Sequence, residues 1–150
     1  MIAFVLDAGV AVKWLIPAAG ETLSAESCQL LKRYVDGEID FIIPDIFWAE
    51  VGNTLWKGVQ QRRWPPVLAE NAASEMRERN FLTISSLTLL PEALKIALSH
   101  ERSVYDCIYV ALAIQFKTQM ITADEGLATA LAARLPVKWL GAFLTGQEEW

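Results

Sequence analysis

The sequence predicts an α/β protein: a single domain over residues 1–150, with one mostly parallel sheet of about five strands and helices on both faces. Three observations support this prediction. Short, continuous apolar segments recur along the chain and are typical of strands buried on both faces. Helical patterns separate them, and such alternation favours a parallel sheet. The length of 150 residues suits one ordinary domain.

Each expected strand is a short apolar run. The first, IAFVL, is unbroken, and the later ones read FII, FLTI, QMIT and VKWL. Such runs are the usual length of strands, and turn-forming residues follow several of them. In chain order, the expected strands are Ile2–Leu6, Phe41–Ile43, Phe81–Ile84, Gln119–Thr122 and Val137–Leu140.

The segments between these strands carry helical patterns. Their boundaries are marked by Gly37, Pro44, Pro65, Pro66 and Pro136, since glycine and proline commonly end or begin helices. The expected helix Ser103–Phe116 is apolar on every face and is therefore expected to be buried. In chain order, the expected helices are Thr22–Val35, Asp45–Gln61, Val67–Arg79, Pro91–Ser99, Ser103–Phe116 and Glu125–Ala133.

Composition excludes several classes of protein. Thirteen Lys and Arg against eighteen Asp and Glu give a net charge of −5, which argues against a protein that coats nucleic acid through general electrostatics. The longest run without a charged residue, from Asn80 to Pro91, is too short for the roughly 20 residues of a membrane span. The amino terminus has no basic start before its apolar run, so we expect a cytoplasmic protein. Cys28 and Cys107 lack metal-ligand spacing and are expected to be core residues.

Two aspartates follow expected strands directly. Asp7 comes after the first strand, and Asp124 comes after QMITA. Open α/β sheets bind their ligands at the carboxyl ends of strands, so the two carboxylates are candidates for one site. A simpler alternative is that each is the N-cap of the following helix, where Asp is a favoured residue.

A third aspartate, Asp106, lies in the apolar helical stretch SVYDCIYVALAIQF. Ser103 is a good N-cap, and Asp106 follows three residues later, as in a capping box. That arrangement explains the position of Asp106 but not its apolar neighbours. An unpaired carboxylate among apolar side chains is costly, so we expect a cation near Asp106.

Two further candidates have surface alternatives. Glu50, Asn53 and Lys57 fall on one side of an amphipathic helix, and this pattern alone favours a solvent-exposed stripe. The basic pair Arg62 and Arg63 precedes Trp64 and is typical of a solvated helix end.

Four segments together resemble a known family. In order they are VLDAG, IPDIFWAEVGNTLWK, SVYDCIYVALAIQ and MITADEGLATA. This order is similar to that of the PIN-domain family of metal-dependent ribonucleases, and most similar to its VapC-like toxins of bacterial and archaeal toxin–antitoxin pairs. The resemblance spans nearly the whole chain. It implies a three-layer α/β/α PIN-like fold, in agreement with the alternation of strands and helices.

The resemblance also implies a set of site residues. It places Asp7, Glu50, Asp106 and Asp124 at the four acidic positions of the family, as catalytic residues that hold Mg²⁺ or Mn²⁺. Carboxylate oxygens without histidine or cysteine suit these ions better than zinc. A bound ion could activate water for hydrolysis of an RNA phosphodiester. Thr122 and Asn53 lie where the family often has polar groups that support the ligands. Gly9 is a departure, because many relatives have Ser or Thr there.

Partners follow from the surface and from the resemblance. Six tryptophans exceed what one small core is expected to bury, which favours a homodimer and a surface that receives an antitoxin segment. Lys13, Arg62 and Arg63 are candidate RNA contacts. Two alternatives stay open: a non-catalytic PIN-like module that binds RNA or takes part in an assembly, and a magnesium phosphohydrolase of another α/β family. Those phosphohydrolases usually have a second Asp where this chain has Gly9.

Overall fold

A computed structural model describes residues 2–16 and 22–145. In these ranges one parallel sheet of five strands has the spatial order β3-β2-β1-β4-β5. The predicted α/β class and parallel five-stranded sheet are therefore confirmed. The strands are β1 (Ile2–Leu6), β2 (Ile39–Pro44), β3 (Leu82–Ile84), β4 (Met120–Thr122) and β5 (Val137–Trp139).

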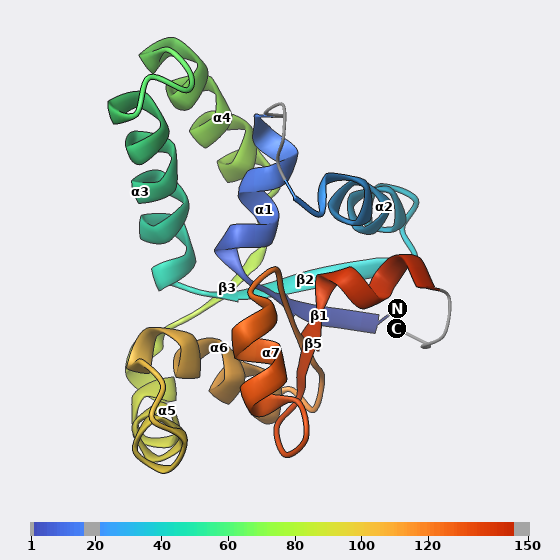
Figure 1. Ribbon diagram of the computed structural model, residues 1–150, viewed down its shortest axis with the longest axis vertical. Coiled ribbons are helices and arrows are strands. Elements are labelled where there is room, and N and C mark those ends of the chain that lie inside the picture. Colours follow the sequence, from blue (N-terminus) through green and yellow to red (C-terminus); the bar gives the residue numbers. More distant parts are fainter. Residues whose placement is uncertain (1, 17–21, 146–150) are drawn as a thin grey trace.

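Helices cover both faces of this sheet. Figure 1 shows α1 to α4 on one side of the sheet and α5 to α7 on the other, so the three-layer arrangement is also confirmed. A 3₁₀ segment, η1, follows the last strand and contacts α2. The elements are α1 (Ala8–Leu15), α2 (Ser24–Val35), α3 (Ile46–Gln60), α4 (Pro66–Glu78), α5 (Ser86–His100), α6 (Val104–Gln115), α7 (Glu125–Leu131) and η1 (Leu140–Thr145).

Two helices differ from the sequence prediction. The helix α1 was not among the expected elements, because it has only eight residues, begins directly after β1 and has a glycine, a poor helix former, at its second position. The helix α5 begins at Ser86, well before the expected start at Pro91. Ser85 caps α5 by accepting a 3.2 Å hydrogen bond from the Leu87 N–H. Pro91 therefore lies inside the helix and not at its start. The remaining helices and strands lie within about two residues of the predicted ends.

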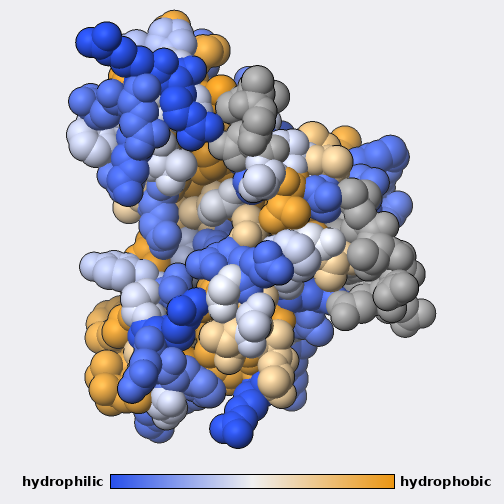
Figure 2. Space-filling view, viewed as in Figure 1, coloured by the Kyte–Doolittle hydropathy of each residue, from blue (hydrophilic) through white to orange (hydrophobic). Residues whose placement is uncertain are grey.

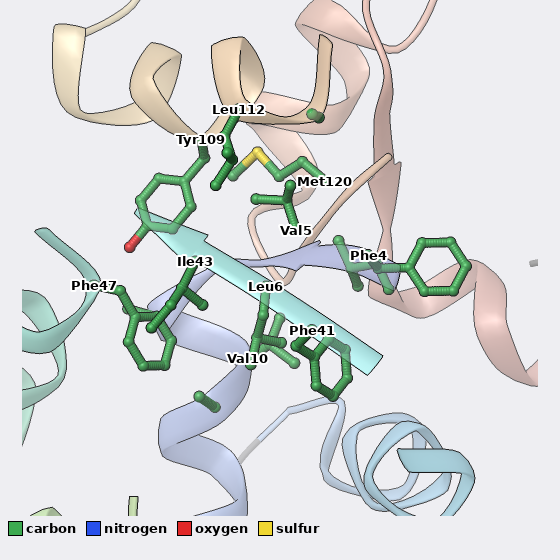
Figure 3. Packing of buried hydrophobic residues seen from close by; sticks show 14 of the residues in the cluster. Phe4, Val5, Leu6, Val10, Phe41, Ile43, Phe47, Tyr109, Leu112 and Met120 are labelled. Carbon is green, nitrogen blue, oxygen red and sulfur yellow. The ribbon is translucent and has the colours of Figure 1, made fainter. Parts of the chain in front are cut away.

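The core consists of side chains from both faces of the sheet. Figure 3 shows Val5, Leu6 and Ile43 from the strands packed among Phe47, Tyr109 and other helix residues. Cys107 is buried as expected, whereas Cys28 is exposed, so the prediction of a core position was wrong for Cys28. No helix in the described part of the chain has the length and apolar character needed to cross a membrane.

The strand order creates a particular position for a site. From the central strand β1 the chain continues to β2 on one side, while β4 lies against its other side. The strand order therefore runs outward from β1 in both directions. Such a point leaves a crevice at the carboxyl ends of β1 and β4, where open α/β sheets bind ligands. The Asp7 N–H donates a 3.1 Å hydrogen bond to the Ile121 carbonyl, which fixes the end of β1 beside the end of β4.

Candidate active site

Asp7 is the residue on which the site is centred. It follows β1 and occupies the N-cap position of α1, but its side chain makes no capping hydrogen bond. The backbone N–H groups of Ala8 and Gly9 nevertheless lower the pKa of Asp7, so the carboxylate faces the start of α1 without forming a regular cap. Instead, the Thr122 hydroxyl donates a 2.8 Å hydrogen bond to Oδ2 of Asp7. Burial raises the pKa of Asp7 to about 6, and the charge of Asp106 adds to this effect, while the Thr122 hydroxyl opposes it.

Thr122 connects two of the acidic residues. It is fully buried at the end of β4, and its oxygen also accepts a 3.1 Å hydrogen bond from the Asp124 N–H. Asp124 is exposed and is the N-cap of α7, since its Oδ1 accepts a 3.0 Å hydrogen bond from the Leu127 N–H. Capping uses one carboxylate oxygen of Asp124, so the cap and a ligand role are compatible.

Asp106 lies in the first turn of α6, in half-buried surroundings. The Ser103 oxygen accepts a 3.2 Å hydrogen bond from the Asp106 N–H, so Ser103 is the N-cap that the sequence predicted. Burial raises the pKa of Asp106, and the charge of Asp124 acts in the same direction. The Ser103 hydroxyl and the Arg102 guanidinium act in the opposite direction. The Arg102 side chain is therefore one positive charge that acts on Asp106.

Glu50 is not on a solvent-exposed stripe, contrary to the pattern of its helix. It is half-buried on α3, and the Tyr109 hydroxyl donates a 3.1 Å hydrogen bond to its Oε1. Burial raises the pKa of Glu50 to about 7. The charge of Asp7 raises it further, the Tyr109 hydroxyl lowers it, and the charge of Asp106 raises it.

Sequence reasoning missed the role of Tyr109, which lies in the apolar stretch SVYDCIYVALAIQF that surrounds Asp106. It is 1% exposed, and burial is the main reason why its own pKa is raised. Figure 3 shows its ring projecting from α6 toward the end of β2, with the hydroxyl at its far end. One signal was available: Tyr109 follows Asp106 by three residues, so the two share a face of the helix.

The four acidic residues thus come from four different elements and influence one another. Each of Asp7, Glu50 and Asp106 has its pKa raised by at least one other member, and Asp124 acts on Asp106. Within residues 2–16 and 22–145, no three Asp, Glu, His or Cys side chains are close enough to form a metal site as they stand. The arrangement is an all-oxygen donor set whose members repel one another, and a hard divalent cation is the group that would draw them together.

The other candidate residues lie outside this cluster. Asn53 is exposed on α3 and makes no hydrogen bond with the described part of the chain. Lys13 donates a 2.7 Å hydrogen bond to the Thr22 carbonyl. Arg62 and Arg63 are exposed in the turn after α3, and the Arg63 guanidinium lies 5.0 Å from the Trp64 ring centroid. Glu50 lies ten residues before the end of α3 at Gln60, about 15 Å along the helix axis, and Arg62 lies beyond that end.

Gly9 lies next to the cluster, in the first turn of α1. It is exposed, and a Cβ atom built there meets no other heavy atom within 4 Å. A larger residue is therefore not excluded by packing. The glycine instead means that this position supplies no hydroxyl to the site.

Comparisons with known proteins agree with the fold. The family model described as "PIN domain" matches residues 4–131. A curated relative, "Ribonuclease VapC3" of Pyrobaculum aerophilum, is 34% identical over 95 residues, which are 59% of this chain and 70% of that protein.

Solved structures share the fold at low sequence identity. PAE2754 from Pyrobaculum aerophilum aligns with a TM-score of 0.68 and 19% identity, over 96% of this chain and 88% of that one. A toxin–antitoxin complex from Klebsiella pneumoniae aligns with a TM-score of 0.61 and 18% identity, over 90% of this chain and 95% of that one. VapBC2 from Rickettsia felis, bound to a DNA fragment from its promoter, aligns with a TM-score of 0.59 and 11% identity. The alignment covers 92% of this chain and 98% of that one.

Proposed function

This chain belongs to the PIN domain family, and on that premise we propose that it is a metal-dependent endoribonuclease, the toxin of a toxin–antitoxin pair. The observation that carries the proposal is that Thr122 joins Asp7 to the Asp124 N–H where β1 and β4 end, and that the charges of the four acidic residues act on one another there. The relative named Ribonuclease VapC3 supports the ribonuclease activity. The toxin–antitoxin structures with the same fold support the biological class.

Asp7, Glu50, Asp106 and Asp124 would hold Mg²⁺ or Mn²⁺ in this proposal. The residues fit such an ion, because they offer only oxygen ligands and because burial makes the ionised forms of Asp7 and Glu50 costly without a cation. A bound ion would supply an activated water and charge stabilisation at the phosphodiester. Thr122 and Tyr109 are the groups that orient the ligands, through their hydrogen bonds to Asp7 and Glu50.

The proposed partners are RNA as substrate and an antitoxin protein, which would place the activity in the cytoplasm. We also infer a homodimer, but from a different surface than the sequence indicated. Trp64 is buried and Trp14 is half-buried, whereas Trp56 on α3 is 56% exposed, so the tryptophans of the described residues are only in part available for an interface. Figure 2 shows apolar side chains gathered over α5 at the lower left. Four exposed leucines at helical spacing account for this patch: Leu87, Leu90, Leu94 and Leu98.

Light scattering tests the dimer. The leucine patch predicts a dimer at micromolar concentration that dissociates when Leu94 and Leu98 are both replaced by glutamate. A strictly monomeric wild-type protein would exclude the homodimer, and a dimer that survives this double substitution would exclude the α5 patch as its interface.

Cleavage of mixed cellular RNA by the purified protein, free of antitoxin, tests the enzymatic proposal. The wild type with Mg²⁺ or Mn²⁺ should cut at discrete positions, whereas EDTA or the substitution Asp106→Asn should abolish cutting. Asparagine has nearly the same volume as aspartate but lacks the charge. If the wild type and the Asp106→Asn variant are equally inactive with both metals, the chain is a non-catalytic PIN-like module.

A further inference from the structure

Arg102 lies near Asp106, whose pKa its charge lowers, and no part in substrate binding has been assigned to it so far. It is located in the short connection between α5 and α6, directly before the N-cap Ser103. Glu101 ends α5 in the left-handed conformation, with φ of 54°, and this sharp turn brings Arg102 to the start of α6. Asp106 follows within the first turn of that helix.

The guanidinium of Arg102 is incompletely partnered. Its Nε is buried, and it forms no hydrogen bond with the described part of the chain. Within the same residues, Arg102 forms no ion pair with a carboxylate at 4.0 Å or less. Its charge nevertheless acts on Asp106 and on the neighbouring Cys107. The side chain thus carries a positive charge at the rim of the site without being neutralised there, and the residue remains partly exposed.

The guanidinium of Arg102, whose Nε has no partner among the described residues, is available to bind an anion. Buried donors are almost always satisfied, and a guanidinium presents several N–H groups in a planar fork that matches phosphate oxygens. A polyanion that approaches four carboxylates is repelled by them, so a fixed cation next to the cluster would favour its binding. Asp106 is not that anion, because the two side chains are not in ion-pair contact.

We propose that Arg102 binds a backbone phosphate of the RNA beside the acidic cluster. This inference rests on the proposed ribonuclease function and adds a substrate-binding residue to it. Among the basic residues, Arg102 is the one whose charge acts on a member of the acidic cluster, Asp106. Since Arg102 contacts a phosphate and not a base, its contribution is the same for every RNA sequence.

Binding of a fluorescein-labelled single-stranded RNA, followed by fluorescence anisotropy, tests the proposal. Measurements in EDTA and in Ca²⁺ at several salt concentrations compare the wild type with Arg102→Gln, Arg102→Lys and a control, Arg134→Gln. Arg134 is exposed beyond the carboxyl end of α7, whereas Asp124 precedes its amino end. Arg102→Gln should weaken binding about tenfold and reduce the slope of log K against log salt by about 0.7, the value for one phosphate on a single strand.

The variants separate the alternatives. Arg102→Lys should bind with intermediate affinity, because it keeps the charge and loses the fork, and Arg134→Gln should bind like the wild type. Equal affinity and equal salt slope for the wild type and both Arg102 variants, in EDTA and in Ca²⁺, would overturn the proposal. If the wild type cleaves RNA but Arg102→Gln binds normally, only the Arg102 proposal fails. If binding depends on Arg102 but no cleavage occurs with Mg²⁺ or Mn²⁺, only the enzymatic proposal fails.

Discussion

The hydroxyl of Tyr109 donates a 3.1 Å hydrogen bond to Oε1 of Glu50 and thereby joins α6 to α3 across the acidic cluster. Tyr109 is fully buried, whereas Glu50 is half-buried. A hydrogen bond to the charged form of a carboxyl group lowers its pKa, and Tyr109 has this effect on Glu50. The contact therefore keeps Glu50 closer to the ionised form that a metal ion requires.

The first prediction concerns Tyr109→Phe, which removes this hydroxyl and leaves the ring. The pKa of Glu50 should rise above about 7, so Mn²⁺ affinity at neutral pH should fall several-fold, and the pH at which cleavage reaches half its maximum should increase. Stability should fall by about 0.5–1.5 kcal/mol. Calorimetric Mn²⁺ titration at pH 6, 7 and 8 measures the effect. The control is Tyr105→Phe on the same helix, since Tyr105 is 68% exposed; an equal loss in both variants would contradict a specific role for Tyr109.

The second prediction separates the two roles of Asp124. Asparagine is as good an N-cap as aspartate, whereas alanine is not. Asp124→Asn should therefore unfold at nearly the wild-type temperature, while Asp124→Ala should lose about 1 kcal/mol, or about 2–4 °C. Both should lose metal-dependent cleavage if the carboxylate is a ligand. Wild-type cleavage by Asp124→Asn would show that Asp124 is only a cap.

The third prediction is a dependence of stability on pH that a divalent ion removes. The pKa values of Asp7 and Glu50 rise on folding, from 3.8 to about 6 and from 4.5 to about 7. Between about pH 4 and 7 the folded protein therefore binds more protons than the unfolded chain, so these groups make stability fall as pH rises through this range. The stability that they contribute is fully present below about pH 4 and is lost above about pH 7.

Thermal unfolding in EDTA and in Mg²⁺ measures this dependence. The two groups should lower the unfolding temperature by several degrees between pH 5 and 7.5 in EDTA, and Mg²⁺ should raise it more at pH 7.5 than at pH 5. The variant Asp7→Asn with Glu50→Gln should lose most of both effects. A Mg²⁺ effect that is equally large at both pH values would mean that the ion binds elsewhere.

The fold was more predictable than the site because it depends on patterns that extend over many residues. The run Ile2–Leu6 reads as a buried strand without knowledge of its partners, and the structure has it at those residues. The helix α5 was harder, because Pro91 indicates a helix start, whereas the cap at Ser85 is a single side-chain hydrogen bond. Local signals of this kind compete, and the sequence does not show which one prevails.

The site depended on contacts between residues far apart in the chain. Glu50 and Tyr109 are 59 positions apart, and Thr122 and Asp7 are 115 apart, so no local pattern reveals either hydrogen bond. Periodicity put Glu50 on a solvent-exposed face because it could not include the packing of α6 against the end of β2. Only the resemblance to a family indicated Glu50, and it gave no indication of Arg102.

The fourth prediction concerns Thr122, which donates to Asp7 and accepts from the Asp124 N–H. Thr122→Val preserves the shape but leaves the part-buried Asp124 N–H without its acceptor and removes the donor to Asp7. It should cost about 1–3 kcal/mol and raise the pKa of Asp7 above about 6. Thr122→Ser keeps the hydroxyl and is the matched control. Denaturant unfolding should rank the wild type and Thr122→Ser well above Thr122→Val, and equal stabilities would show that the hydroxyl is dispensable.

The last prediction concerns the packing of Trp64 on α3. Gly58 is buried, and a Cβ atom there would overlap the Trp64 indole, whose Nε1 donates a 3.0 Å hydrogen bond to the Leu55 carbonyl. Gly58→Ala should therefore displace the indole, break this bond and cost about 1–3 kcal/mol. Gly52 lies on the same helix with nothing within 4 Å of its Cβ position, so Gly52→Ala should stabilise by about 0.5–1 kcal/mol. Thermal unfolding followed by tryptophan fluorescence compares the two alanines, and destabilisation by Gly52→Ala equal to that by Gly58→Ala would reject the indole contact as the cause.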